Sequence, residues 1–236
     1  MRLLLLSNSA NRGEGFLEYP KNEISGFLGN TVKNVLFIPF AAVTFSYNEY
    51  EMLVADKFET MGYQLQSIHR FKNYSKAIKN ADAIIVGGGN TFILLNTLQQ
   101  TGLLKLIRKK ILSGTPYVGW SAGANITCPT IRTTNDMPVI QMKTLNALNL
   151  VPFQINPHYT DDIPKGFAGE TRDMRIREFT EINKNIYVIG LREGTMLKIT
   201  DNKIKLIGNK KARIFYSDKN PEEYQNTDDI NFLLKG

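Results

Sequence analysis

The segment that most constrains the fold is 117–125, with the sequence YVGWSAGAN. Its apolar start indicates a short buried strand, and a Gly-x-Ser-x-Gly turn then leads directly into a helix. Gly119 and Gly123 flank Ser121, and only residues with little or no side chain fit around so sharp a turn. The pattern predicts a nucleophilic serine at a strand end, in front of a helix N-terminus whose free N–H groups suit a developing oxyanion.

Apolar runs of strand length alternate with helical patterns through the first two-thirds of the chain. Strands are expected at 3–6, 35–39, 63–69 and 83–86, and helices at 47–61 and at 94–112, with a break at Gly102. Repeated βα units of this kind imply a parallel sheet with helices on both faces. We therefore predict a doubly wound, mainly parallel α/β fold, with ligand sites at the carboxyl ends of the strands.

The last third of the chain changes character. Short strands are expected at 197–200, 203–207 and 212–216, joined by turn-forming Asp-Asn and Gly-Asn pairs. This spacing predicts an antiparallel meander that extends the same sheet at its C-terminal side. Because no linker or internal repeat interrupts the pattern, we expect one domain over residues 1–236.

Charge and cysteine content limit the possible partners. The net charge is +7, but the basic residues are scattered and form no run typical of a nucleic-acid-binding tail. One cysteine, Cys128, allows no internal disulfide and fits a reducing compartment. No apolar stretch approaches the ~20 residues that span a bilayer. We expect a cytoplasmic protein without nucleic-acid or membrane partners.

A nucleophilic serine needs a general base, and the chain has two histidines. His158 follows the apolar segment 148–153 and lies in a polar loop after a predicted strand end, with Pro157 before it. His69 lies within or at the end of a predicted strand in the N-terminal half. The loop setting favours His158 as the base.

The base in turn needs an acid that holds its tautomer. Asp136 follows the elbow helix in a predicted loop, and Glu193 follows a predicted strand at 186–189, between two glycines. The sequence does not decide between them. Two separated histidines and one cysteine provide no typical zinc ligand set, so neither a metal nor another cofactor is expected.

A run of three glycines, 87–89, follows the predicted strand 83–86. It lacks the Lys-Ser/Thr pair of a P-loop and the spacing of a dinucleotide-binding fingerprint. Glycines at a strand end let backbone N–H groups approach a reacting carbonyl closely. We expect this loop to complete an oxyanion hole together with the N–H of Ala122.

Five short segments, taken in order, resemble the motif series of the peptidase E family, serine peptidases on a class I glutamine-amidotransferase-like, flavodoxin-like fold. They are VGGGNTF (86–92), GWSAGAN (119–125), NDMP (135–138), NPH (156–158) and GLREG (190–194). The resemblance extends from Leu3 to the predicted meander, with no departure at a motif position. It implies hydrolysis of dipeptides with an N-terminal aspartyl residue through an acyl-serine intermediate, by a monomer or homodimer.

The resemblance also implies roles for individual residues. The nucleophile and base would be Ser121 and His158, the oxyanion donors Gly88 and Ala122, and the group that recognises the aspartyl carboxylate Arg172. Arginine suits that last task because its planar fork meets a carboxylate bidentately. For the acid, the family pattern leaves both Asp136 and Glu193 open.

Three alternative functions are compatible with parts of this sequence. A cyanophycinase-like peptidase acting on β-aspartyl bonds would share Ser121 and the elbow. A glutamine amidotransferase would carry cysteine at the elbow, and we expect Cys128, seven residues further on, to be a small buried apolar residue. A non-catalytic flavodoxin-like module could instead bind an anion through its glycine-rich loop.

Overall fold

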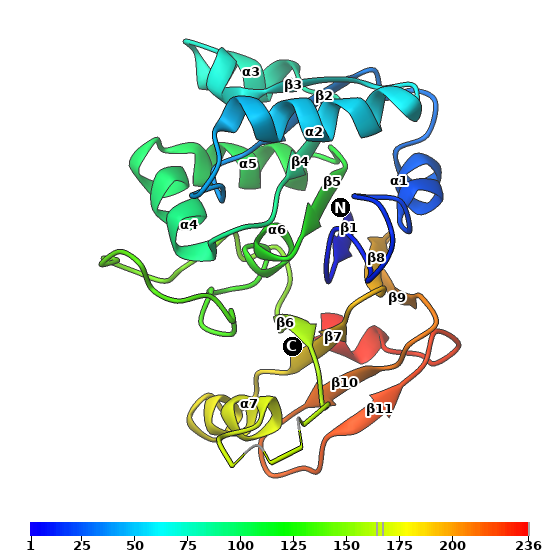
Figure 1. Ribbon diagram of the computed structural model, residues 1–236, viewed down its shortest axis with the longest axis vertical. Helices are drawn as coiled ribbons and strands as arrows, with labels where there is room; N and C mark the ends of the chain where they lie inside the picture. The colour runs from blue at the N-terminus through cyan, green and yellow to red at the C-terminus, as the bar shows by residue number, and fades with distance from the viewer. Residues whose placement is uncertain (164, 167, 236) are drawn as a thin grey trace.

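The computed structural model describes residues 1–163, 165–166 and 168–235. In that part of the chain the strands form two sheets (Figure 1). The larger sheet has the strand order β3-β2-β4-β5-β1-β8-β9. Its strands are β1 (Arg2–Leu6), β2 (Asn34–Ile38), β3 (Gln64–Ser67), β4 (Ala83–Val86), β5 (Tyr117–Trp120), β8 (Met196–Thr200) and β9 (Lys203–Ile207). The first five are parallel, and β8 and β9 continue the sheet antiparallel.

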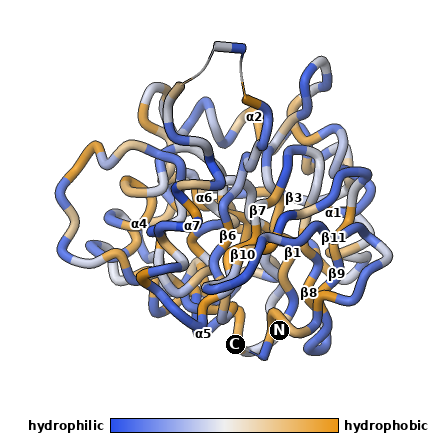
Figure 2. The backbone as a smooth tube through the Cα atoms, turned by 90° about the horizontal axis from the view of Figure 1, so that it is seen from below, coloured by the Kyte–Doolittle hydropathy of each residue, from blue (hydrophilic) through white to orange (hydrophobic). Residues whose placement is uncertain are grey.

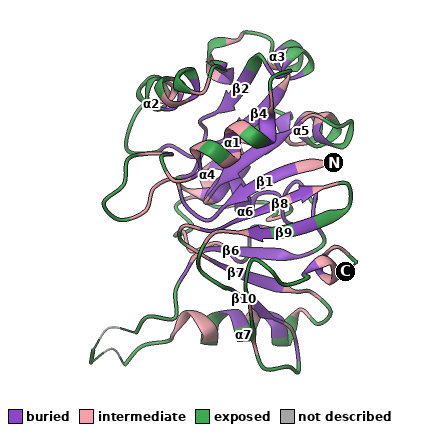
Figure 3. Ribbon diagram, turned by 90° about the vertical axis from the view of Figure 1, so that its right-hand side faces the viewer, coloured by how far each residue is buried: buried purple, intermediate pink, exposed green. Residues whose placement is uncertain are grey.

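The smaller sheet has the order β11-β10-β7-β6 and lies beyond the β9 side of the larger sheet (Figures 1 and 3). Its strands are β6 (Gln154–Tyr159), β7 (Val188–Arg192), β10 (Ala212–Phe215) and β11 (Glu222–Tyr224). Strands β6 and β7 pair in parallel, whereas β10 pairs antiparallel with both β7 and β11. The α/β class, with a mainly parallel sheet and a C-terminal antiparallel extension, is thereby confirmed.

Helices cover both faces of the larger sheet. They are α1 (Lys21–Leu28), α2 (Tyr47–Thr60), α3 (Tyr74–Asn80), α4 (Thr91–Gln100), α5 (Leu103–Leu112) and the short α6 (Ala122–Asn125), while α7 (Arg172–Ile182) covers the smaller sheet. Alternate strand residues serve two cores, because successive side chains point to opposite faces. Leu4 and Phe37 pack toward α1 and α2, whereas Leu5 and Ile84 pack toward α3, α4 and α5.

One apolar core reaches across both sheets. Leu5 of β1 belongs to the same buried cluster as Leu191 of β7 and Ile214 of β10. Figure 2 shows hydrophobic stretches in the interior and hydrophilic ones mainly at the outside. The central strands β1, β2, β4 and β5 are almost entirely buried, as Figure 3 shows, whereas the edge strands β3, β9 and β11 also carry exposed residues. Burial on both faces explains why the central strands, such as β1 and β4, are uninterrupted apolar runs.

Three details of the sequence-based prediction are wrong. The meander is split: β8 and β9 form a hairpin on the larger sheet, but β10 pairs with β7 in the smaller one. The expected strand 63–69 ends at Ser67 and is followed by a 3₁₀ turn, Ile68–Arg70. The apolar segment 148–153 is not a strand, and His158 lies inside β6 rather than in a loop beyond it.

A second 3₁₀ turn, Asn231–Leu234, packs near the C-terminal end of the described chain. None of the described helices is both long and apolar enough to cross a bilayer.

Candidate active site

The elbow predicted from the sequence is present at the end of β5. Ser121 separates β5 from α6 and has φ 53° and ψ −113°, a conformation that residues other than glycine rarely adopt. The neighbouring chain packs too closely for larger residues: a Cβ on Gly123 would lie 2.1 Å from the Val86 carbonyl oxygen. A Cβ on Gly119 would lie 2.3 Å from the Gly123 carbonyl oxygen. A side chain at either position would clash with the neighbouring backbone, so both positions require glycine.

Ser121, His158 and Glu193 form a hydrogen-bonded chain. The Nε2 atom of His158 lies 3.0 Å from Ser121 Oγ, and its Nδ1 atom lies 2.7 Å from Glu193 Oε1. A carboxylate accepts but does not donate, so the Nδ1–H of a neutral imidazole points to Glu193 and leaves Nε2 as an acceptor for the serine proton. This geometry is that of a nucleophile, a base and an orienting acid.

An irregularity in the smaller sheet turns His158 toward the serine. The β6–β7 register shifts between Pro157 and Tyr159, and His158 itself has φ 52°. The backbone of His158 thereby leaves the regular β6–β7 pairing, and its imidazole contacts Ser121. Glu193 directly follows β7, so base and acid leave adjacent strand ends at the same edge.

The glycine loop lies beside the serine. A Cβ on Gly88 would lie 3.1 Å from Ser121 Cβ, so the loop backbone is in contact with the elbow. A buried pair that the sequence analysis missed holds this loop: Trp120 Nε1 donates to Tyr50 Oη (3.0 Å), and Tyr50 donates to the Gly88 carbonyl (3.1 Å). Among the described residues, neither the Gly88 nor the Ala122 N–H donates to a backbone or side-chain acceptor.

Asp136 is placed elsewhere. Its Oδ2 atom accepts from the Thr91 N–H (2.7 Å) and from the hydroxyls of Thr91 and Thr134. Thr91 is the first residue of α4, so Asp136 satisfies a free N–H at that helix N-terminus, where a negative charge is favourable. The carboxylate thereby fastens the 134–138 loop to the segment that follows the glycine run. Glu193, and not Asp136, contacts His158.

Arg172 begins α7, whose N-cap Thr171 accepts from the Met174 N–H. Its guanidinium donates to Asn135 Oδ1, which also accepts from Asn156 Nδ2 at 2.6 Å. Desolvation, together with the charge of Arg175, lowers the pKa of Arg172. No carboxylate among the described residues forms an ion pair with Arg172. A half-buried cation held by an amide oxygen is suited to receive an anion from outside.

Asn135 belongs to the NDMP motif, and the sequence alone predicts no role for it. Its Nδ2 atom donates to the Pro157 carbonyl (2.6 Å), next to His158. The same amide therefore connects Arg172 with the strand that carries the predicted base. The neighbouring Asp136 had drawn attention because of its charge, whereas an amide in a loop carries no comparable signal.

A network of ion pairs that includes Arg192, next to Glu193, was also not predicted from the sequence. Arg192 at the end of β7 donates to Asp161 (2.7 Å) and Glu223 (2.8 Å), and its guanidinium lies over the Tyr159 ring. The hydrogen bond from Arg192 is the main reason that the pKa of Asp161 is lowered. Arg213 extends the network to Asp161, Glu223 and Asp173. Strands β6, β7, β10 and β11 are linked by it.

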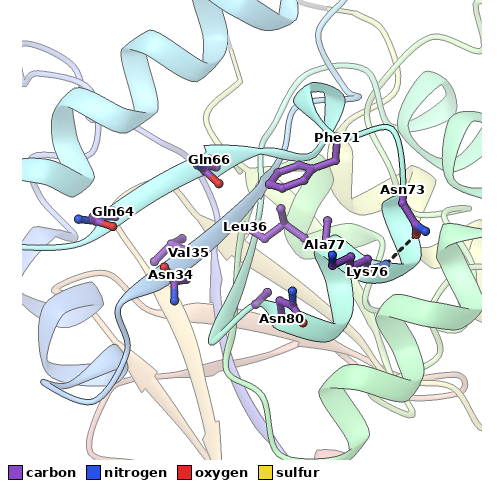
Figure 4. Close-up of a pocket in the computed structure, with 11 residues that line it drawn as sticks. Asn34, Val35, Leu36, Gln64, Gln66, Phe71, Asn73, Lys76, Ala77 and Asn80 are labelled. Atoms are coloured by element: carbon purple, nitrogen blue, oxygen red, sulfur yellow. Dashed lines mark hydrogen bonds between the residues drawn. The ribbon is translucent and has the colours of Figure 1, made fainter.

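Two adjoining cavities lie beside the predicted base and the predicted substrate-binding arginine, and Ser121 lines neither of them. One of about 450 Å³ is lined by His158, Glu193 and Lys210, and one of about 310 Å³ by Arg172 and its neighbours. Both include Asp161 and Asp162 in their walls. A third cavity, of about 480 Å³, lies at the β2–β3 edge beside α3 and contains none of the predicted site residues (Figure 4).

The remaining candidates are structural. His69 follows β3, with its ring nitrogens 2.6 Å from Ser67 Oγ and 2.8 Å from Asn48 Oδ1, in a different part of the fold from Ser121. Cys128 is fully buried, as expected, and burial raises the pKa of its thiol to about 12. Within the described ranges, no three His, Cys, Asp or Glu side chains gather as a metal-binding group.

Comparisons with known proteins show which family the chain belongs to. The family model of peptidase family S51 matches residues 3–207. A protein named Peptidase E from Nostoc sp. is 52% identical over 99% of this chain and 97% of its own length. Another of that name, from Salmonella typhimurium, is 44% identical over 91% of this chain and 93% of its own length.

Solved structures share the fold. A Listeria monocytogenes protein assigned as a peptidase E superposes with a TM-score of 0.67, at 26% identity over 88% of this chain and 98% of that chain. A peptidase from an acI-B1 Actinobacterium superposes with a TM-score of 0.71, at 19% identity over 97% of this chain and 96% of that chain. The chain is a serine-type peptidase and belongs to peptidase family S51.

Proposed function

We propose that this peptidase hydrolyses dipeptides whose N-terminal residue is aspartate, through an aspartyl-serine ester. Two observations together support this proposal. The Ser121–His158–Glu193 chain can perform acyl transfer. The Arg172 guanidinium, which has no carboxylate partner among the described residues, is linked through Asn135 to the Pro157 carbonyl, next to His158. The name Peptidase E of the relatives agrees with this substrate class.

The proposed reaction begins when His158 Nε2 takes the proton of Ser121 Oγ and the oxygen attacks the aspartyl carbonyl carbon. The carbonyl oxygen becomes negative and accepts hydrogen bonds from the N–H groups of Gly88 and Ala122. When the C–N bond breaks, His158 returns the proton to the leaving amine. Water, deprotonated by His158, then attacks the ester carbonyl and releases aspartate and free Ser121.

Two carboxylates have separate tasks in this scheme. Glu193 holds the His158 tautomer and stabilises the imidazolium that forms during attack. Asp136 fixes the loop that carries Asn135 to the N-terminus of α4, and thereby acts on the site from outside the reacting chain. Arg172 binds the side-chain carboxylate of the substrate through two parallel N–H···O bonds.

The direct test is a panel of dipeptides incubated with the wild-type chain. We expect turnover of α-Asp-Leu and none of Leu-Leu or N-acetylated α-Asp-Leu. Turnover of β-Asp-Leu alone would replace the proposal with a cyanophycinase-like specificity. Absence of turnover with every dipeptide, together with salt-dependent anion binding, would favour the non-catalytic module instead.

The role of Arg172 predicts a change in specificity. Arg172→Met should lower kcat/KM for α-Asp-Leu by about 10²- to 10³-fold, because the substrate carboxylate then loses its charged partner. The loss for α-Asn-Leu should be much smaller, so the preference for Asp over Asn collapses. Arg177→Met is the matched control, since Arg177 is exposed on the same helix. Equal losses for both substrates would contradict the assignment of Arg172.

A further inference from the structure

A single hydroxyl stands between the two sheets at the active site. Ser7 directly follows β1 in the larger sheet and is fully buried. Its Oγ–H donates to the Leu191 carbonyl of β7 at 2.6 Å, and its oxygen accepts from the His158 N–H of β6 at 2.9 Å. Both partners belong to the smaller sheet, and neither is near Ser7 in sequence.

The two partners of Ser7, the His158 N–H and the Leu191 carbonyl, lie where the β6–β7 pairing is irregular. The register shift between Pro157 and Tyr159 takes His158 out of the regular ladder, so its N–H needs another acceptor. Buried backbone N–H and C=O groups without a partner are strongly unfavourable. A hydroxyl both donates and accepts, so one serine joins the His158 N–H to the Leu191 carbonyl and replaces a direct strand–strand bond. Alanine cannot do so.

The backbone around Ser7 reaches the other parts of the site. The Leu6 carbonyl accepts from the Ser121 N–H at 3.0 Å, and the Ser7 N–H donates to the Thr195 carbonyl at 3.0 Å. The next residue continues the pattern, since Asn8 Oδ1 accepts from the Gly194 N–H at 2.9 Å. Residues 6–8 thus contact the segments that carry the nucleophile, the base and the acid.

We propose that Ser7 is a positioning residue for the general base. Through its two hydrogen bonds it holds the His158 backbone in the left-handed conformation that aims the imidazole at Ser121. Its hydroxyl is fully buried and bonds to backbone groups, so it acts through His158. The inference rests on the proposed catalytic function of Ser121 and His158, but it does not depend on which dipeptide is cleaved.

The test separates catalysis from substrate binding. Ser7→Ala should lower kcat for α-Asp-Leu by about 10- to 100-fold, the order of loss expected when a reacting group is displaced by about 1 Å. The Kd of α-Asp-Leu, measured by calorimetry in the Ser121→Ala background with and without Ser7→Ala, should change less than about 2-fold. The rate at which a fluorophosphonate labels Ser121 should fall in parallel with kcat.

Two further variants complete the experiment. Ser9→Ala is the matched control on the same segment and should retain wild-type rates, because its hydroxyl makes no hydrogen bond with another described residue. Ser7→Cys keeps the branching of the side chain, with a larger sulfur that hydrogen-bonds weakly, so it should show an intermediate loss. It also decides the matter if Ser7→Ala does not fold.

Wild-type kcat and labelling rates in Ser7→Ala or Ser7→Cys would overturn the inference. So would a rise in Kd as large as the fall in kcat, because that would indicate general damage to the site. If the fluorophosphonate labels Ser121 of the wild type but the wild type cleaves no aspartyl dipeptide, the proposed substrate is wrong. The labelling rates of the Ser7 variants then still test the role of Ser7.

Discussion

Ser121→Ala should lower kcat for α-Asp-Leu by about 10⁴- to 10⁶-fold, the largest effect expected of any single substitution in this chain. The expectation follows from the way nucleophile, base and acid act as one unit: without the Oγ atom, the proton acceptor on His158 has nothing to activate. The rate that remains would come from oxyanion stabilisation and substrate orientation alone. Progress curves with enough enzyme to detect a residual rate measure this directly.

The variant should still bind its substrate. Calorimetric titration of Ser121→Ala with α-Asp-Leu is expected to show binding, because Arg172 and the glycine loop are unchanged. Ser113→Ala, at an exposed position after α5, is the matched serine control and should keep full activity. A Ser121→Ala protein that retains more than about 1% of wild-type kcat would refute the serine mechanism.

Glu193→Gln should lower kcat by about 10³- to 10⁴-fold, whereas Asp136→Asn should lower it by about 10-fold or less. The difference arises from their hydrogen bonds. Glu193 accepts from His158 Nδ1, and an amide there can present N–H instead, which favours the wrong tautomer. The amide introduced by Asp136→Asn still has an oxygen that can accept from the Thr91 N–H, so the loop anchor is largely preserved.

Parallel kinetics of the two variants on α-Asp-Leu decide the assignment. Melting temperatures of both proteins should be compared, since Asp136→Asn also removes a charge at a helix N-terminus and is expected to act partly on stability. A larger loss in Asp136→Asn than in Glu193→Gln would reverse the roles. Small and equal losses in both would show that neither carboxylate orients the base.

The sequence was most informative where structure is local. The strand 83–86 matches β4, and the break at Gly102 separates α4 from α5, because apolar periodicity and glycine act over a few residues. The elbow at Ser121 could be predicted equally well, because close backbone contacts leave no room for side chains at its glycines.

The pairing of strands that are far apart in the chain could not be predicted from the sequence. The strand Ala212–Phe215 has the same apolar character whether it joins β9 or β7, and only the assembled sheets determine its partner. The two acids could not be separated for the same reason: Asp136 and Glu193 both follow strands or helices in polar loops. Ser7 gave no signal, because a lone serine at a strand end is common.

The division of the site between two sheets affects how this peptidase would lose activity. Ser121 is carried by the larger sheet, while His158 and Glu193 are carried by the smaller one. A slight separation of the sheets would lengthen the 3.0 Å contact between Oγ and Nε2 while both sheets kept their own ladders. Activity is therefore expected to depend on how closely the two sheets are held together by the apolar core they share, and to respond to a change there before either sheet loses its strand pairing.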